Sequence, residues 1–147
     1  QAAQPAGLSP ATAASRMGSG SIVIVDDERA LTILMTRMLE RHGFRVTAFT
    51  DPRLALDHLR TTGGSVDVLV TDMSMPAMSG FHLVQAVREI LPLLPIVVAT
   101  GYLRQEDIDA GNDLGVSRFV LKPDQFEQIG AILGELLGVP GGAVAGR

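Results

Sequence analysis

The segment VDVLVTDMSMPAMSG, residues 66–80, joins an apolar run to a carboxylate and then to a turn. Its first five residues have the apolar, β-branched composition of a buried strand. Asp72 follows two residues later, and Pro76 and the Ser79-Gly80 pair are residue types that turns favour. A charged residue at the end of such a strand indicates that Asp72 lies at the edge of the sheet as part of a functional site.

Strand and helix patterns alternate on both sides of this segment. Short, nearly all-apolar runs predict four further strands, at residues 21–25, 44–49, 95–100 and 117–121. Apolar residues at helical spacing predict helices within residues 26–43, 52–60, 81–90, 103–115 and from 124 onward. Apolar strands that alternate with helices are typical of a parallel sheet covered on both faces. The sequence therefore predicts an α/β fold, a (βα)5 doubly wound parallel five-stranded sheet in a three-layer sandwich.

Two of the predicted helices differ in how well they are anchored. The first has five apolar residues at the spacing of one buried face, namely Leu31, Leu34, Met35, Met38 and Leu39. The helix within residues 103–115 contains Gly111 and has only Ile108 and Leu114 as large apolar residues after Leu103. We therefore expect it to be the least firmly held helix.

Length, composition and charge limit the classes of protein. The 147 residues suit one domain, which we place at residues 21–138, between a flexible leader, linker or vector-derived segment (1–20) and a flexible tail (139–147). The net charge of −4 gives no footprint for nucleic acid. The absence of cysteine excludes disulfides and thiolate metal sites. No signal peptide or bilayer-spanning run is evident, so we expect a cytoplasmic domain without membrane contact.

Polar side chains end four of the five predicted strands: Asp26 with Asp27, Asp72, Thr100 and Lys122. Taken singly, Asp27 could be a helix cap, Asp72 a turn residue and Lys122 a surface cation. In a doubly wound sheet, however, these strand ends meet at one edge. Two carboxylates about 5 Å apart repel by roughly 3 kcal/mol at an effective dielectric near 20, so the cluster needs a counter-charge. Oxygen ligands favour a hard cation such as Mg2+, and Mg2+ beside a lysine and a hydroxyl suits a phosphoryl group.

Four segments resemble, in order and spacing, the receiver domain of two-component response regulators over about residues 21–138: IVIVDDE (22–28), VLVTDMSMPAMSG (68–80), VVATGY (97–102) and FVLKP (119–123). The resemblance implies a flavodoxin-like sheet and a phosphoacceptor domain of a phosphorelay. Its partner would be a histidine kinase or a histidine phosphotransfer domain, in the same polypeptide or another. It implies no enzyme beyond assistance to its own Mg2+-dependent phosphorylation and dephosphorylation.

The resemblance also implies a role for each residue of the strand-end cluster. Asp72 matches the aspartate that accepts the phosphoryl group. Asp27, Asp72 and the backbone carbonyl of Ser74 would bind Mg2+, and Asp26 would act on it through water. Lys122 would contact the phosphoryl oxygens.

Five further positions carry roles that the resemblance implies. Thr100 would hydrogen-bond the phosphoryl group, and Phe119 would be the switch aromatic whose rotamer follows that threonine, on a face made by residues 104–137. Pro76 and Gly80 would shape the loop after the acceptor. Pro123 is expected to follow a cis peptide bond.

Other interpretations remain open from the sequence. A haloacid-dehalogenase-like Mg-dependent phosphatase also uses an aspartate nucleophile, a lysine and Mg2+, but it needs a second aspartate where this chain has Ser74. A receiver that serves only as an interaction module is a third interpretation. The TGY segment resembles receivers at the C-terminus of hybrid sensor histidine kinases, and a free-standing regulator, a monomer or weak dimer, is the alternative.

Further residues carry expectations of their own. Bulk at Tyr102, two residues after Thr100, predicts slow loss of the phosphoryl group. The methionines of the 73–79 loop could cover the site or form a docking surface for a partner. The histidines are scattered over different predicted helices, so we expect none of them to be a metal ligand.

Overall fold

The computed structural model describes residues 20–62, 65–122 and 126–137. The elements follow one another in the order β2 (Ser21–Val25), α2 (Arg29–Arg41), β3 (Arg45–Phe49), α3 (Pro52–Thr62), β4 (Val68–Asp72), α4 (Gly80–Ile90), β5 (Ile96–Thr100), α5 (Gln105–Asp113), β6 (Arg118–Leu121), a 3-10 turn (Phe126–Gln128) and α6 (Ile129–Leu137). Strands and helices alternate as predicted. The described part of the chain contains no helix long and apolar enough to cross a bilayer.

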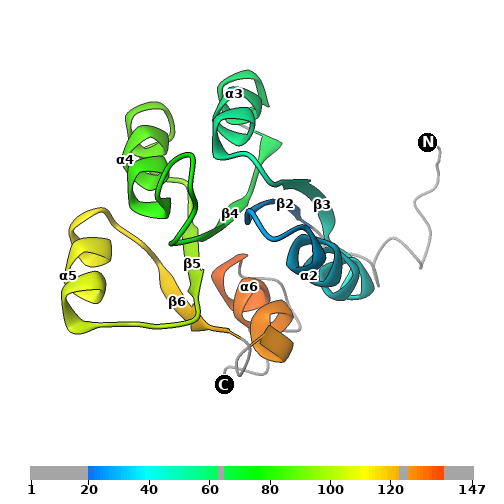
Figure 1. The fold of residues 1–147 in the computed structure, drawn as a ribbon. Helices are drawn as coiled ribbons and strands as arrows, with labels where there is room; N and C mark the ends of the chain where they lie inside the picture. Colours follow the sequence, from blue (N-terminus) through cyan, green and yellow to red (C-terminus); the bar gives the residue numbers. More distant parts are fainter. Residues whose placement is uncertain (1–19, 63–64, 123–125, 138–147) are drawn as a thin grey trace.

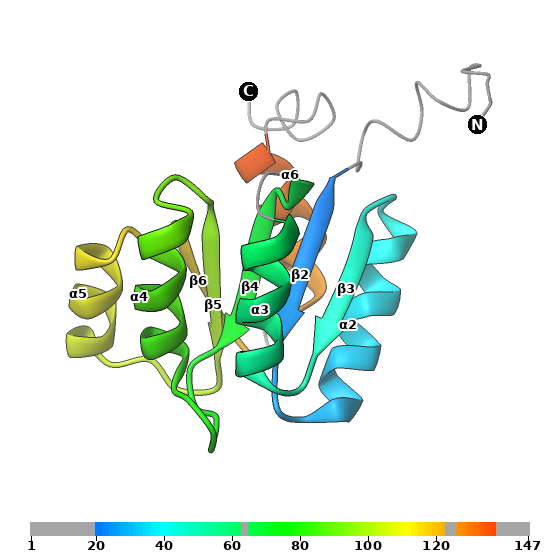
Figure 2. The same ribbon diagram turned by 90° about the horizontal axis from the view of Figure 1, so that it is seen from above.

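The five strands form one parallel sheet in the order β3-β2-β4-β5-β6. The arrowheads of the strands lie at one edge of the sheet (Figure 2). The chain runs outward from β2 to β3 and then crosses to β4 on the other side, so the strand order reverses between β2 and β4. In sheets of this kind, ligands bind beyond the carboxyl ends of the strands at this reversal. The predicted doubly wound five-stranded sheet is confirmed.

Helices cover both faces of the sheet (Figure 1). On one face α3 and α4 bury their apolar stripes against the sheet, with Leu59 and Leu83 at the centre. On the other face α2 and α6 do the same through Met35, Leu39 and Leu133. Each buried side chain of this size stabilises the fold by about 1.5–3 kcal/mol relative to an exposed one. Packing on both faces therefore fixes the positions of the central strands and of the polar residues at their carboxyl ends.

The buried face of α2 differs from the prediction at one position. Leu34 is 47% exposed, although its spacing placed it with the other apolar residues. Thr32 is buried instead, and its hydroxyl donates a hydrogen bond to the carbonyl of Arg29 at 2.8 Å, which satisfies it without solvent. A pattern that counts apolar residues alone therefore omits this threonine, although its side chain is buried like theirs.

Helix α5 is held differently from the others. Its buried residues are Asp107 and Gly111, and neither brings a large apolar side chain into the core. Gly111 lies so close to the ring of Phe119 that a Cβ there would be 2.3 Å from a ring carbon. Arg88 of α4 donates hydrogen bonds from Nε and Nη2 to the carbonyls of Leu114 and Gly115 just after α5, at 2.8 and 2.9 Å. Helix α5 is thus held by close packing against the Phe119 ring and by the hydrogen bonds of Arg88, and not by a stripe of buried apolar side chains.

Candidate functional site

Asp72 is the last residue of β4, and the backbone that follows it turns sharply. The amide of Gly80 donates to the carbonyl of Met73 at 2.8 Å, which closes the 73–79 loop onto the strand end. A Cβ at Gly80 would lie 2.2 Å from the Asp72 carbonyl oxygen, so only glycine allows this approach. Ser79 caps α4 by accepting a hydrogen bond from the amide of His82 at 3.2 Å. The closed loop keeps the Asp72 carboxyl group at the sheet edge.

Asp26 and Asp27 follow β2, the strand next to β4. Their side chains differ in exposure, because Asp26 is buried at 1% exposure and Asp27 is exposed. The Asp26 backbone amide donates to the carbonyl of Phe49 at 3.1 Å, and its Oδ1 accepts from the amide of Glu28 at 2.9 Å. Asp26 is therefore fixed by neighbours on both sides, whereas Asp27 is free to face the solvent.

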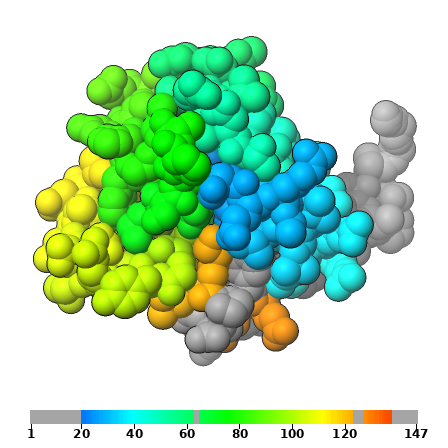
Figure 3. Space-filling view, in the orientation of Figure 1, coloured from blue at the N-terminus to red at the C-terminus, as the bar shows by residue number. Residues whose placement is uncertain are grey.

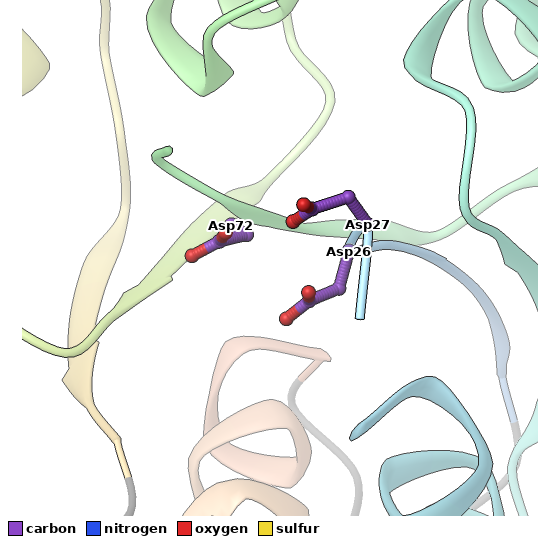
Figure 4. A group of neighbouring side chains, drawn as sticks. All are labelled: Asp26, Asp27 and Asp72. Atoms are coloured by element: carbon purple, nitrogen blue, oxygen red, sulfur yellow. The ribbon is translucent and has the colours of Figure 1, made fainter. Parts of the chain in front are cut away.

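The carboxyl groups of Asp26, Asp27 and Asp72 meet at the strand ends. One oxygen atom from each lies within 4.8 Å of the others (Figure 4). A set of oxygen atoms of this kind, with neither sulfur nor imidazole, suits a hard cation. The donor set thus fits Mg2+.

Lys122 follows β6 and supplies the positive charge of the cluster. Its Nζ donates to Asp26 Oδ2 at 2.8 Å and lies 3.1 Å from Asp72 Oδ1, with the side chain 11% exposed. The Lys122 backbone amide donates to the Thr100 carbonyl at 2.8 Å, which extends the pairing of β6 with β5. The lysine therefore bridges the two most buried carboxylates.

Burial and neighbouring charges shift the protonation of this group. Burial raises the pKa of Asp72 above the ordinary aspartate value, and Asp26 adds to the rise while Lys122 opposes it. Burial alone would lower the pKa of Lys122, but its hydrogen bonds to Asp26 and Asp72 outweigh that and hold the pKa above the ordinary lysine value. The lysine is thus charged, and the fold penalises the charge of Asp72 relative to that of an ordinary aspartate.

Thr100 ends β5 on the rim of the same site. Its hydroxyl donates to the Tyr102 carbonyl at 3.1 Å and is 3.4 Å from the Tyr102 amide nitrogen, so it closes a local turn. Phe119, the predicted switch aromatic, is half-buried against Gly111 and does not line the cavity. The bond before Pro123 lies outside the described residues.

A cavity of about 560 Å³ opens over the carboxylates. Its lining residues are Asp27, Glu28, Asp72, Met73, Ser74, Thr100, Gly101, Tyr102, Arg104, Asp107 and Lys122. The segments that bound it converge on the face shown in Figure 3, where blue, green, yellow-green and orange meet. Sequence reasoning missed Arg104 and Asp107, although their place four and seven residues after Thr100 puts them at the start of the next helix.

The methionines of the loop after β4 pack mainly inward. Met75 is 8% exposed, and Met73 and Met78 pack against the core from partly buried positions. Pro76 is exposed and borders a smaller apolar hollow of about 340 Å³ with Pro52 and Met75. Met73 also lines the larger cavity, so this inward packing favours the interpretation that these methionines cover the site. None of the three histidines lines the larger cavity.

Comparison with known proteins identifies the family. The sequence matches the response regulator receiver domain over residues 22–133. The chain belongs to this family.

Relatives and solved structures are similar over most of this chain. The chemotaxis protein CheY of Pseudomonas aeruginosa is 37% identical over 105 residues, which cover 69% of this chain and 83% of that protein. The sensor kinase CckA of Brucella abortus is 30% identical over 122 residues, 82% of this chain but 13% of that protein. The structure of the Vibrio cholerae chemotaxis protein CheY4 superposes with a TM-score of 0.76 at 27% identity, covering 81% of this chain and 99% of that one. The chain spans half or less of several other curated relatives that it matches.

Proposed function

We propose that this receiver domain is the phosphoacceptor of a two-component phosphorelay and that Asp72 accepts the phosphoryl group. The observation that carries the proposal is the contact of the Asp72 carboxylate with Lys122, within 4.8 Å of two further carboxylates at the mouth of a cavity. An ordinary surface aspartate has neither the buried lysine nor the acidic neighbours.

The transfer follows from the chemistry of the side chains. A carboxylate oxygen of Asp72 attacks the phosphorus of a phosphohistidine, the new O–P bond forms, and the electrons of the P–N bond return to the imidazole. Asp27, Asp72 and the Ser74 carbonyl would hold Mg2+, with Asp26 acting through water. When bound, Mg2+ neutralises charge on the transferred group. Lys122 is placed to contact the phosphoryl oxygens, because its Nζ already lies 3.1 Å from Asp72 Oδ1.

The donor in this proposal is a histidine kinase or a histidine phosphotransfer domain. Similarity to a region of the sensor kinase CckA supports a receiver within a hybrid kinase, and similarity to CheY supports a free-standing regulator. A cytoplasmic location, a monomeric or weakly dimeric state, a domain at residues 21–138 and the absence of nucleic-acid contact belong to the same proposal. The phosphatase alternative gains no support, because Ser74 stands where its second catalytic aspartate is needed.

The output of phosphorylation would pass through α5, β6 and α6. Thr100 would exchange its bond to the Tyr102 carbonyl for a phosphoryl oxygen, and Phe119 would follow. Helix α5 is suited to move, because it buries no large apolar side chain of its own. Two-state elements of receivers and similar switches are drawn from such weakly held segments.

Loss of the phosphoryl group is proposed to be slow. Tyr102 lines the cavity and is 71% exposed, so its ring can shield the group from water. We expect a half-life of minutes or longer at room temperature and a several-fold shorter one for Tyr102→Ala, measured by intact mass after removal of the phosphodonor. A wild-type half-life of seconds would contradict the shielding role.

Intact mass also tests the proposal itself. Incubation with acetyl phosphate and Mg2+ should add the mass of one phosphoryl group to the wild type and none to Asp72→Asn. Chelation of Mg2+ should abolish the gain in the wild type. Equal phosphorylation of both proteins would reject Asp72 as the acceptor.

A further inference from the structure

Arg104 occupies a position in the cavity that the proposed transfer does not use. It is the residue before α5, in extended conformation with φ −104° and ψ 160°, and it lines the same cavity as Asp72, Thr100 and Lys122. Its side chain is 54% exposed, so it lies at the mouth of the cavity and not in its floor. A phosphodonor entering the cavity would therefore meet this guanidinium.

The hydrogen bonds of Arg104 leave most of its donors unused. Its Nε donates to Asp107 Oδ2 at 3.3 Å, slightly beyond the usual range for such a bond. The same oxygen accepts from the Arg104 backbone amide at 3.2 Å. Within residues 20–62, 65–122 and 126–137, neither Nη atom has a partner at hydrogen-bond distance. The guanidinium is thus held at one corner and has two free terminal nitrogens.

The charge balance of the cavity makes those nitrogens significant. Four carboxylates line it, from Asp27, Glu28, Asp72 and Asp107, against two cations, Arg104 and Lys122. Lys122 is already shared between Asp26 and Asp72. A phosphoryl group carries a charge of about −1.5 to −2 at neutral pH. Lys122 has one N–H donor beyond the two directed at Asp26 and Asp72, whereas both Nη atoms of Arg104 keep all their donors. A guanidinium also matches phosphoryl oxygens with paired hydrogen bonds.

We propose that Arg104 is a second cationic ligand of the phosphoryl group on Asp72, beside Lys122. The side chain turns inward, its Nη atoms donate to phosphoryl oxygens, and Nε leaves Asp107. Because Arg104 is the N-cap residue of α5, this movement carries the effect of Asp72 phosphorylation directly to the start of that helix. Asp107 keeps its bond to the Arg104 backbone amide, so the helix retains its cap. The inference rests on the proposed function and deepens it.

The alternative role for Arg104 is to neutralise Asp107, which is 8% exposed, and so to support α5. The two roles differ in what Asp107→Asn does. The asparagine side chain still accepts from the backbone amide but no longer holds the guanidinium by charge. If Arg104 binds the phosphoryl group, this change frees it and binding is kept or strengthened. If Arg104 only supports the helix, Asp107→Asn and Arg104→Ala both weaken binding.

Beryllium fluoride with Mg2+ is the probe, because it occupies a phosphoaspartate position without hydrolysis. Tyr102 is the single tyrosine and the chain has no tryptophan, so fluorescence excited near the tyrosine band reports from the cavity itself. Titrations compare the wild type with Arg104→Ala, Asp107→Asn and Arg60→Ala. Arg60 is the matched control, an arginine paired with Asp57 on the surface of α3. Amide spectra of residues 101–107 give a second readout.

We expect Arg104→Ala to weaken beryllium fluoride binding about tenfold or more, the effect of losing charge-assisted hydrogen bonds. Asp107→Asn should bind at least as tightly as the wild type, and Arg60→Ala should be unchanged. Equal binding by Arg104→Ala and the wild type would overturn the inference, as would weakening by Asp107→Asn. Asp72→Asn separates the two proposals: if it binds the probe like the wild type, the proposed function fails and not only the role of Arg104.

Discussion

Asp72 lies under two opposing demands. In the proposed phosphoacceptor role it must be ionised, yet burial raises its pKa above the ordinary aspartate value and Asp26 adds to the rise. Lys122 offsets part of this penalty and Mg2+ would offset more. In the proposed role, such a carboxylate would serve the chemistry of the site at the expense of stability.

Neutralising this residue should therefore stabilise the fold. Asp72→Asn keeps an oxygen for Lys122 and removes one of three clustered charges. We expect its free energy of unfolding at pH 7 without Mg2+ to exceed that of the wild type by about 1 kcal/mol, part of the roughly 3 kcal/mol of repulsion between two such charges. Urea denaturation of both proteins measures the difference.

The pH dependence gives the control for this prediction. A carboxyl group whose pKa is raised by folding lowers stability when ionised, so the penalty is present above its folded pKa and disappears as the pH falls below the unfolded value. The advantage of Asp72→Asn should therefore shrink as the pH is lowered from 7 towards 4. An advantage that stays constant over this range would mean that the Asp72 charge is not its cause.

At the scale of the element, α5 is the part of the fold whose attachment is least like the others. It is placed by the ring of Phe119 against Gly111 and by the hydrogen bonds of Arg88 to the carbonyls after its end. Each contact involves few atoms and depends on exact positions, so a small displacement of α5 would break it. This is the physical reason for proposing α5 as the element that moves.

Gly111→Ala tests the ring contact. Alanine favours a helix over glycine by about 1 kcal/mol, so the change would stabilise a freely exposed helix. Here the new Cβ would meet the Phe119 ring at 2.3 Å, and we expect a net loss of about 1–3 kcal/mol. Thermal or urea unfolding measures the loss. Replacing the ring by a smaller side chain, by adding Phe119→Leu to Gly111→Ala, should recover part of it.

Gly101→Ala is the matched control for that experiment. A Cβ at Gly101 would meet nothing within 4 Å, so its stability should stay close to the wild type. Equal stability of Gly111→Ala and Gly101→Ala would show that α5 does not depend on the fit against Phe119.

At the scale of the whole molecule, most of the fold and the central residues of the site could be predicted from the sequence. Apolar strands alternating with helices allow few topologies, and parallel strands bring their carboxyl ends to one edge. That rule alone was enough to place Asp26, Asp27, Asp72, Thr100 and Lys122 together. These residues follow directly from strand ends, which apolar runs locate well.

Contacts that depend on side-chain direction could not be predicted in this way. Leu34 has the spacing of the buried face of α2 and yet points to solvent, while Thr32 is buried because its hydroxyl finds a backbone carbonyl. Arg104 and Asp107 reach the cavity from a loop and the first turn of a helix, where no periodicity fixes direction. Their place in the lining of the cavity is therefore visible in the structure and not in the sequence pattern.

The measurement that tests the central claim most directly is chemical mapping of the phosphorylated residue. Wild-type protein phosphorylated by acetyl phosphate and Mg2+ is reduced with borohydride, which converts an aspartyl phosphate to homoserine, and is then digested for tandem mass spectrometry. We predict homoserine at position 72 and unmodified aspartate at positions 26 and 27. Homoserine at either of those positions, or none at position 72 after a full phosphoryl mass gain, would contradict the account.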